Sequence, residues 1–283
     1  MSHRGRHQPA EPFFLKADLG ERFCIYYPPA ASKKCLGAFI YVHPFAEEMN
    51  KSRHMVAMQS RALAESGYAV LQLDLYGCGD SSGDFADATW EIWLEDIARA
   101  EEWILQKVSS PIGLWGLRLG AVLVLDYAKK YSGNFSTIVL WQPVINTGQY
   151  LTQFLRMSLA GEIVTDGKKG NSGTTHLRHE LAAGKPVEIA GYMLSPLLAN
   201  DLEKIVTTQL AVTSCRIHWF EFISESRQTL TPAGENLVSS WKKQGSDLSV
   251  HYVPCTPFWA TQEISTCPAL LDEMARIFLH EMT

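Results

Sequence analysis

Gly116 and Gly120 flank the position at which this sequence gives its most specific indication of catalytic chemistry. Gly116-Leu117-Arg118-Leu119-Gly120 follows a short apolar run and precedes an apolar segment of helical length. In a strand-turn-helix of the form G-x-S-x-G, the central serine stands above a sheet beside backbone N–H groups that stabilise an oxyanion. The central residue here is Arg118, whose guanidinium stays protonated and has no nucleophilic atom. The spacing therefore predicts a nucleophile elbow without a nucleophile.

A cation at the start of a helix needs a negative partner, because the helix end already presents unpaired N–H groups and the positive end of the macrodipole. A ligand anion would satisfy Arg118 and the helix end together, and a carboxylate or phosphate suits the guanidinium fork. An internal carboxylate would satisfy Arg118 without a ligand. The candidates for that role are Glu47, Glu48, Glu221 and Glu225, and both interpretations stay open.

Cys78 and Ser81 are the alternative nucleophiles, and both lie in a glycine-rich stretch. A cysteine thiolate needs a base or a lowered pKa, and His43 at a neighbouring strand end could act as that base. The glycines on either side of Cys78 indicate a tight turn and say nothing of reactivity. We therefore interpret Cys78 as a packed turn residue and His43 as a hydrogen-bonded scaffold residue.

Composition limits the partners of the chain. Its 283 residues include 25 Lys+Arg and 30 Asp+Glu, a formal net charge of −5, with both signs scattered along the sequence. Such a balance argues against nucleic acid as a partner. The polar start and the lack of an apolar run of about 18 or more residues predict a cytoplasmic protein without a membrane span. The six cysteines are spaced singly, which predicts mostly buried thiols and no metal site; no cofactor is expected.

Apolar runs of strand length alternate with amphipathic segments of helical length along most of the chain. We predict an N-terminal hairpin over 13–28, buried strands over 36–42, 68–73, 112–115, 135–141, 217–223 and 248–253, and helices over 53–65, 90–108, 119–129, 232–243 and 268–280. Because alternating strands and helices form βαβ units, the strands are expected to build a mainly parallel sheet. The fold class is therefore α/β.

The alternation stops between residue 142 and about residue 208. This stretch holds helical fragments and a loop rich in Gly, Lys, Ser and Thr, and its length without a β/α rhythm predicts an insertion over the carboxyl ends of the strands. We accordingly divide the chain into a flexible tail (1–10), a core (11–143 and 209–283) and a lid insertion (144–208).

This order of elements resembles the α/β-hydrolase superfamily over residues 11–281. His43-Pro44-Phe45 resembles its His-Gly oxyanion segment, and the stretch from Asp74 to Ser81 resembles its D-x-x-G-x-G-x-S loop. The resemblance implies a sheet of about eight strands with a helical lid, and hydrolysis of carboxylic esters. Three stretches, PFAEEMNKSR, GLRLGA and PFWATQE, more closely resemble a bacterial group of predicted hydrolases encoded beside exosortase and extracellular-polysaccharide genes.

The catalytic positions of that superfamily are replaced here. Arg118 stands for the nucleophile, the position of the acid falls near Gln228, and the loop that carries the family's histidine contains Phe258 and Trp259 but no histidine. Because a triad acts as a unit, loss of the serine or the histidine alone can cost on the order of a million-fold in rate. Serine-type hydrolysis is therefore expected to be negligible.

The favoured hypothesis is a pseudoenzyme of α/β-hydrolase lineage whose pocket binds a small anionic or acyl ligand. The residues predicted to contact that ligand are Phe45, Arg118, Leu119, Gln228, Phe258 and Trp259. One alternative is an active ester hydrolase or acyltransferase that uses Cys78 or Ser81. The other is a non-catalytic partner of another protein, and a homo-oligomer is left open.

Overall fold

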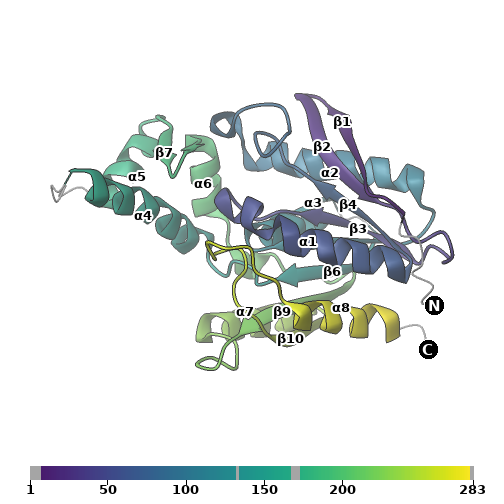
Figure 1. Ribbon diagram of the computed structural model, residues 1–283. Helices are drawn as coiled ribbons and strands as arrows, with labels where there is room; N and C mark the ends of the chain where they lie inside the picture. The colour runs from purple at the N-terminus through teal and green to yellow at the C-terminus, as the bar shows by residue number, and fades with distance from the viewer. Residues whose placement is uncertain (1–7, 132–133, 167–172, 281–283) are drawn as a thin grey trace.

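An eight-stranded sheet forms the centre of the molecule (Figure 1). The computed structural model describes residues 8–131, 134–166 and 173–280, so residues 1–7 of the predicted tail lie outside the described residues. The strands are β1 (Glu11–Ala17), β2 (Gly20–Tyr27), β3 (Gly37–Val42), β4 (Tyr68–Leu73), β5 (Ile112–Leu117), β6 (Phe135–Trp141), β9 (Arg216–Ile223) and β10 (Leu248–Pro254).

The strand order is β1-β2-β4-β3-β5-β6-β9-β10. Strands β1 and β2 form the predicted antiparallel hairpin, and β2 also pairs antiparallel with β4, whereas the remaining neighbours are parallel. The predicted mostly parallel sheet of about eight strands is confirmed. Because the carboxyl ends of the parallel strands share one edge, the residues after β3, β5, β6 and β9 are brought together there.

Helices cover both faces of this sheet (Figure 1). Helices α1 (Glu47–Ser66) and α8 (Pro268–His280) pack on one face, and α2 (Trp90–Lys107), α3 (Leu119–Tyr131) and α7 (Pro232–Lys243) pack on the other. A cluster of buried apolar side chains lies on each side. Since both faces are covered, every residue of β3 and β5 is buried, which explains their almost continuously apolar sequences.

Local capping explains why α2 and α7 begin where the sequence predicts. The Thr89 hydroxyl accepts a 3.2 Å hydrogen bond from the Ile92 amide at the start of α2. Thr231 does the same for Gly234 at the start of α7, where Pro232 is the first helical residue. Helix α1 is the exception, because it begins at Glu47 and not near residue 53 as predicted.

The chain between β6 and β9 forms a separate group of elements that projects to one side of the sheet (Figure 1). Its described part contains α4 (Thr147–Asp166), α5 (Thr174–Ala182), the hairpin β7 (Val187–Ile189) and β8 (Tyr192–Leu194), and α6 (Pro196–Lys204). Two single-turn helices, η1 (Phe85–Asp87) and η2 (Thr207–Gln209), lie in connecting segments. The helical insertion was predicted; the hairpin was not, because three-residue strands give no readable alternation.

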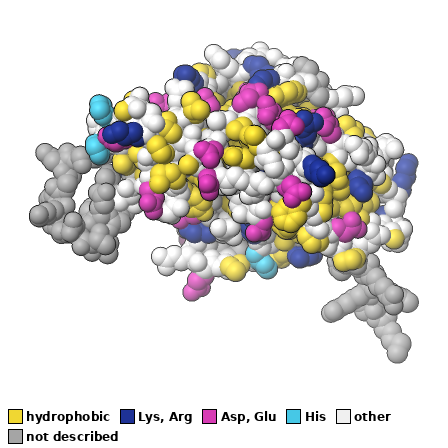
Figure 2. Space-filling model, turned by 90° about the horizontal axis from the view of Figure 1, so that it is seen from above, with side chains coloured by type: hydrophobic (Ala, Val, Ile, Leu, Met, Phe, Trp, Pro, Cys, Tyr) yellow, Lys and Arg dark blue, Asp and Glu magenta, His cyan; other side chains and the backbone are white. Residues whose placement is uncertain are grey.

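The surface carries charges of both signs. On the face shown in Figure 2, acidic and basic side chains are interspersed and no basic stripe is seen. Among the described residues, no helix combines the length and the apolar composition that crossing a bilayer requires.

Candidate functional site

The turn between β5 and α3 has the geometry of a nucleophile elbow. Arg118 is the one residue between them, and its φ of 55° lies in a region that arginine rarely adopts. A Cβ atom on Gly116 would lie 2.4 Å from the Gly120 carbonyl oxygen, and one on Gly120 would lie 2.4 Å from the Val42 carbonyl oxygen. Only glycine fits at either position, and the predicted place of Arg118 at this turn is confirmed.

The guanidinium of Arg118 is held on several sides. Its Nε lies 3.5 Å from Oε1 of Glu48, and its Nη1 donates a 3.4 Å hydrogen bond to the Gln142 carbonyl oxygen. The rings of Tyr150 and Trp259 lie 5.5 and 5.3 Å from the guanidinium carbon, within the range of cation–π attraction. The buried Nε makes no hydrogen bond within the described chain. The guanidinium is therefore oriented, but its donors are far from saturated.

Glu48 joins the elbow to the inserted segment. Its Oε1 faces Arg118, whereas its Oε2 accepts a 2.9 Å hydrogen bond from the Tyr150 hydroxyl of α4. Burial raises the pKa of Glu48, and the neighbouring guanidinium opposes that rise. Of the four carboxylates named from the sequence, Glu48 is the one that pairs with Arg118 among the described contacts.

A second buried carboxylate, that of Glu221, is linked to Arg118 through Gln142. Glu221 on β9 accepts hydrogen bonds from the side chains of Gln142 (3.1 Å), Trp219 (3.0 Å) and Arg227. Gln142 also accepts a 2.6 Å hydrogen bond from the Phe222 amide through its side-chain oxygen. Gln142 thus gives its backbone oxygen to Arg118 and its side chain to Glu221. The sequence contained no signal for this bridging role.

Segments far apart in the sequence meet at a cavity of about 210 Å³ beside Arg118. Its walls are Phe45, Ala46, Glu47 and Glu48 after β3, Arg118 at the elbow, Trp259 and Ala260 after β10, and Tyr150, Gln153, Phe154 and Met157 of α4. The first three groups lie within the sequence stretches PFAEEMNKSR, GLRLGA and PFWATQE. These described lining residues include no serine, threonine, cysteine or histidine.

Strained backbone is concentrated beside this cavity. Ala46, Arg118 and Gln142 have φ values of 51°, 55° and 42°, and they follow β3, β5 and β6. The other positive-φ residue of the described chain that is not glycine, Ala190, lies in the β7–β8 turn. Each such conformation costs about 1–3 kcal/mol and persists where the surrounding structure enforces it, often at functional sites.

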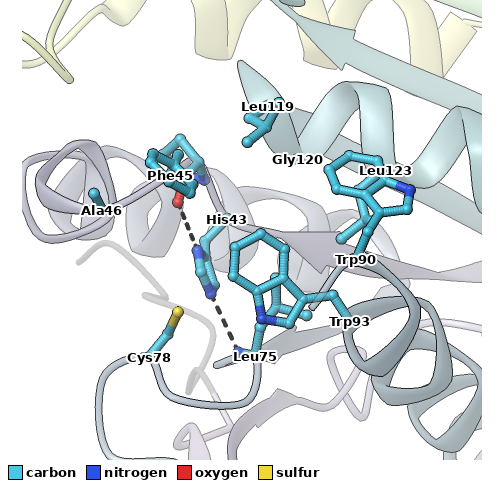
Figure 3. A pocket seen from close by; sticks show the side chains of 11 residues that line it. His43, Phe45, Ala46, Leu75, Cys78, Trp90, Trp93, Leu119, Gly120 and Leu123 are labelled. Carbon is cyan, nitrogen blue, oxygen red and sulfur yellow. Dashed lines mark hydrogen bonds between the residues drawn. The ribbon is translucent and has the colours of Figure 1, made fainter. Parts of the chain in front are cut away.

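His43 is held by hydrogen bonds at both ring nitrogens (Figure 3). Its Nδ1 lies 2.7 Å from the Pro44 carbonyl oxygen, and its Nε2 lies 3.2 Å from the Leu75 amide nitrogen. Because a carbonyl accepts and an amide donates, the ring carries its proton on Nδ1 and accepts at Nε2. Burial lowers the pKa of His43, which favours this neutral form. Both ring nitrogens of His43 are therefore used in structural hydrogen bonds.

Cys78 lies with His43, Trp90 and Trp93 around a void of only about 10 Å³ (Figure 3). Such a volume admits about one water molecule. Burial raises the pKa of the Cys78 thiol well above its ordinary value, so the reactive thiolate is disfavoured. These surroundings support the interpretation of Cys78 as a packed turn residue.

Ser81 is engaged in a structural contact. Its hydroxyl donates a 2.6 Å hydrogen bond to the Asp74 carbonyl oxygen and accepts a 2.9 Å hydrogen bond from the Phe23 amide. The neighbouring Ser82 hydroxyl accepts from the Glu21 amide at 2.9 Å. Both serines thus tie the loop after β4 to β2, away from the elbow cavity.

Of the six residues predicted to contact the ligand, three line the elbow cavity and three do not. Phe45, Arg118 and Trp259 line the elbow cavity, whereas Leu119 lines the small void beside His43. Gln228 is exposed, and its side-chain amide donates a 2.8 Å hydrogen bond to the Ser224 carbonyl oxygen.

Phe258 is likewise outside the cavity wall. It is buried against Trp141 and Phe222. Neighbouring residues in a turn point in different directions, which is why only one of the two adjacent rings faces Arg118. Tyr150, which lies on α4 and lines the cavity, was missed.

The loop that carries Trp259 is closed covalently. Cys255 and Cys267 form a disulfide with a Cα–Cα separation of 5.7 Å, whereas the other four cysteines are free thiols, in line with the expectation that most cysteines are unpaired. Their spacing alone did not suggest a pair. Within the described residues, no group of three or more His, Cys, Asp or Glu side chains is placed to hold a metal ion.

Comparison with known proteins identifies the family. The family model described as serine aminopeptidase, S33, matches residues 33–209. A search of curated proteins finds no match.

Solved structures show the same fold over nearly the whole chain. A soluble variant of monoglyceride lipase from Saccharomyces cerevisiae, in complex with a substrate analogue, is 13% identical over 99% of this chain and 98% of its own, with a TM-score of 0.63. Est1E from Butyrivibrio proteoclasticus with bound ferulic acid is 16% identical over 95% and 97%, with a TM-score of 0.61. A carboxyl esterase from Bacillus coagulans is 15% identical over 87% and 90%, with a TM-score of 0.60. The shared fold is that of the α/β-hydrolases.

Proposed function

The chain belongs to the serine aminopeptidase S33 family of α/β-hydrolases, and from that premise we propose that it is a non-hydrolytic member that binds a small anionic or acyl ligand at the elbow. One observation carries the proposal. Arg118 occupies the elbow position and faces a cavity whose described walls offer neither a serine, threonine or cysteine nucleophile nor a histidine base. Acyl transfer by a serine-type mechanism needs both groups within hydrogen-bond reach of each other.

The cavity wall suits a ligand with a negative head and an apolar body. Among the described contacts, the guanidinium of Arg118 donates one hydrogen bond, to the Gln142 carbonyl oxygen, and its contact with Glu48 is 3.5 Å long, so it retains donors for a ligand oxygen. The rings of Tyr150 and Trp259 lie within cation–π range of the guanidinium and help to hold it in place. Phe45 and Phe154 provide an apolar surface for an acyl chain or ring.

Thermal denaturation with a ligand panel tests this proposal. The panel contains short and medium carboxylates, ferulic acid, acyl phosphates and sugar phosphates, because a ligand that binds only the folded state raises the melting temperature. We expect at least one anion to stabilise the protein and Arg118→Leu to abolish the effect. Arg156→Leu is the matched control, since Arg156 is exposed on α4 and does not line the cavity.

Two results would overturn the proposal. The first is a panel without any stabilising anion. The second is a stabilising anion whose effect survives in a folded Arg118→Leu variant. A fluorophosphonate probe supplies an independent check, because it labels activated serines and should leave this protein unlabelled.

The biological setting that we propose is bacterial exopolysaccharide production or protein sorting. It is supported by the resemblance of residues 44–53, 116–121 and 257–263 to hydrolases encoded beside exosortase genes, and each of these stretches contributes at least one residue to the cavity wall. If this setting is right, loss of the protein should change the extracellular polysaccharide or the sorted proteins of the bacterium that encodes it. An unchanged envelope would contradict the setting without touching the ligand site.

A further inference from the structure

The elbow cavity contains charges of both signs. Arg118 is its only basic lining residue among those described, and Glu47 and Glu48 line it as well. A ligand that carries only a negative charge gains from Arg118, and the two carboxylates weaken its binding without abolishing it. A ligand that carries only a positive charge is attracted by the two carboxylates but repelled by Arg118. The wall therefore favours a ligand in which both charges are present.

The two central charges are close enough to match one small head group. Nε of Arg118 and Oε1 of Glu48 are 3.5 Å apart and are not joined by a hydrogen bond. In an α-amino acid the carboxylate and the ammonium are attached to one carbon atom. Such a head group can lie antiparallel to the Arg118–Glu48 pair, so that each charge meets its opposite.

We infer that the ligand is a small zwitterion of the amino-acid type, with its carboxylate on Arg118, its ammonium on Glu48 and its apolar side chain toward Phe45 and Phe154. This inference rests on the proposed function and narrows its ligand class. Glu47 adds a second carboxylate at the cavity wall, where its only described ion pair is a 3.3 Å contact with Lys51.

The contacts of Glu48 leave it able to receive an ammonium. The Tyr150 hydroxyl donates to Oε2 at 2.9 Å and orients the carboxylate, whereas Oε1 lies 3.5 Å from Nε of Arg118. Burial raises the pKa of Glu48. An ammonium within hydrogen-bond distance would stabilise the charged carboxylate, as Arg118 does. The ligand would thus complete a site that the protein alone only partly satisfies.

Calorimetric titration with three matched probes tests the inference. L-Phenylalanine has both charges, 3-phenylpropionate lacks the ammonium, and 2-phenylethylamine lacks the carboxylate. Because one charge-assisted hydrogen bond is worth about 1.5–3 kcal/mol, we expect phenylalanine to bind at least about tenfold more tightly than either analogue. The set of L-leucine, 4-methylpentanoate and 3-methylbutylamine repeats the comparison with a smaller side chain.

A Glu48→Gln variant locates the ammonium site. Glutamine can still accept from Tyr150, and we expect the preference for phenylalanine over 3-phenylpropionate to fall about tenfold while binding of the carboxylate persists. Glu235→Gln is the control, because Glu235 also lies in the first turn of a helix but is exposed on α7. Circular dichroism verifies that each variant is folded.

The outcomes separate this inference from the proposed function. If 3-phenylpropionate or another anion binds through Arg118 as tightly as the amino acids do, the zwitterion is wrong and the anion site stands. The zwitterion is also wrong, and the anion site also stands, if neither amino acid binds while an anion of the panel does. If neither the amino acids nor any panel anion binds, both proposals are wrong.

Discussion

Nε of Arg118 lies 3.5 Å from Oε1 of Glu48, so the elbow position of the sheet is paired with the first turn of α1. Glu48 in turn accepts the Tyr150 hydroxyl, and Tyr150 belongs to the inserted segment. One carboxylate therefore connects the core helix, the elbow and the insertion. Residues of all three elements line the same cavity.

Restoring the elbow serine should not restore hydrolysis. We expect Arg118→Ser to show no turnover of activated esters above a heat-denatured control, because His43 uses both ring nitrogens in structural hydrogen bonds. The measurement is release of p-nitrophenol from short-chain esters by the wild type and the variant. Turnover in the wild type that Cys78→Ala abolished would instead support the displaced nucleophile.

Stability should fall in mild acid through His218. Burial, followed by the neighbouring His251, lowers the pKa of His218 from 6.5 to about 4. At a pH between these two values, the unfolded chain binds a proton at His218 that the folded chain does not. The stability that neutral His218 contributes is therefore fully present above the unfolded pKa of 6.5. It decreases as the pH falls toward 4, by at most about 3 kcal/mol.

Urea unfolding at neutral pH and at about pH 5 measures this effect. His218→Gln should flatten the pH dependence, although His251, whose pKa is also lowered, will retain a part of it. His54→Gln is the control, because His54 is exposed on α1. Identical pH profiles for the wild type and His218→Gln would refute the assignment.

The ion pair of Arg22 and Asp96 should be essential to stability. Arg22 Nε lies 2.6 Å from Asp96 Oδ1, and each side chain is only 2% exposed. Asp96→Asn leaves the guanidinium buried without its counter-charge, and we expect a loss of about 3 kcal/mol in the free energy of unfolding. Asp247→Asn breaks an ion pair with Arg216 in which both side chains are more than half exposed, and should cost less than about 1 kcal/mol. Equal costs for the two variants would contradict the prediction.

Gly120 should not tolerate a side chain. Its Cβ would lie 2.4 Å from the Val42 and 2.5 Å from the His43 carbonyl oxygens, and backbone atoms cannot move aside cheaply. We expect Gly120→Ala to destabilise the protein by about 3 kcal/mol or more in urea unfolding. Gly148→Ala is the control, because its Cβ would come no closer than 3.5 Å to Asn146 and the change should stay within about 1 kcal/mol. A Gly120→Ala variant as stable as the wild type would show that the backbone at the elbow can shift to make room for a methyl group, contrary to the prediction.

The sequence alone determined the architecture, because its signals are local. The strands over 68–73 and 135–141 and the helices over 232–243 and 268–280 have the predicted bounds. Apolar periodicity, threonine caps and an N-terminal proline act within a few residues of each other, and they are readable without a partner. The position of Arg118 followed in the same way, since the two flanking glycines specify the turn.

Only the tertiary structure decided what Arg118 meets. Glu48 was one of four equal candidates, and its choice depends on α1 beginning at Glu47, directly after the strained Ala46. Trp259 rather than Phe258 faces the guanidinium because the turn directs adjacent side chains differently, and the Cys255–Cys267 disulfide closes that loop. Side-chain pairing across a cavity depends on the relative placement of segments distant in sequence, which no local pattern encodes.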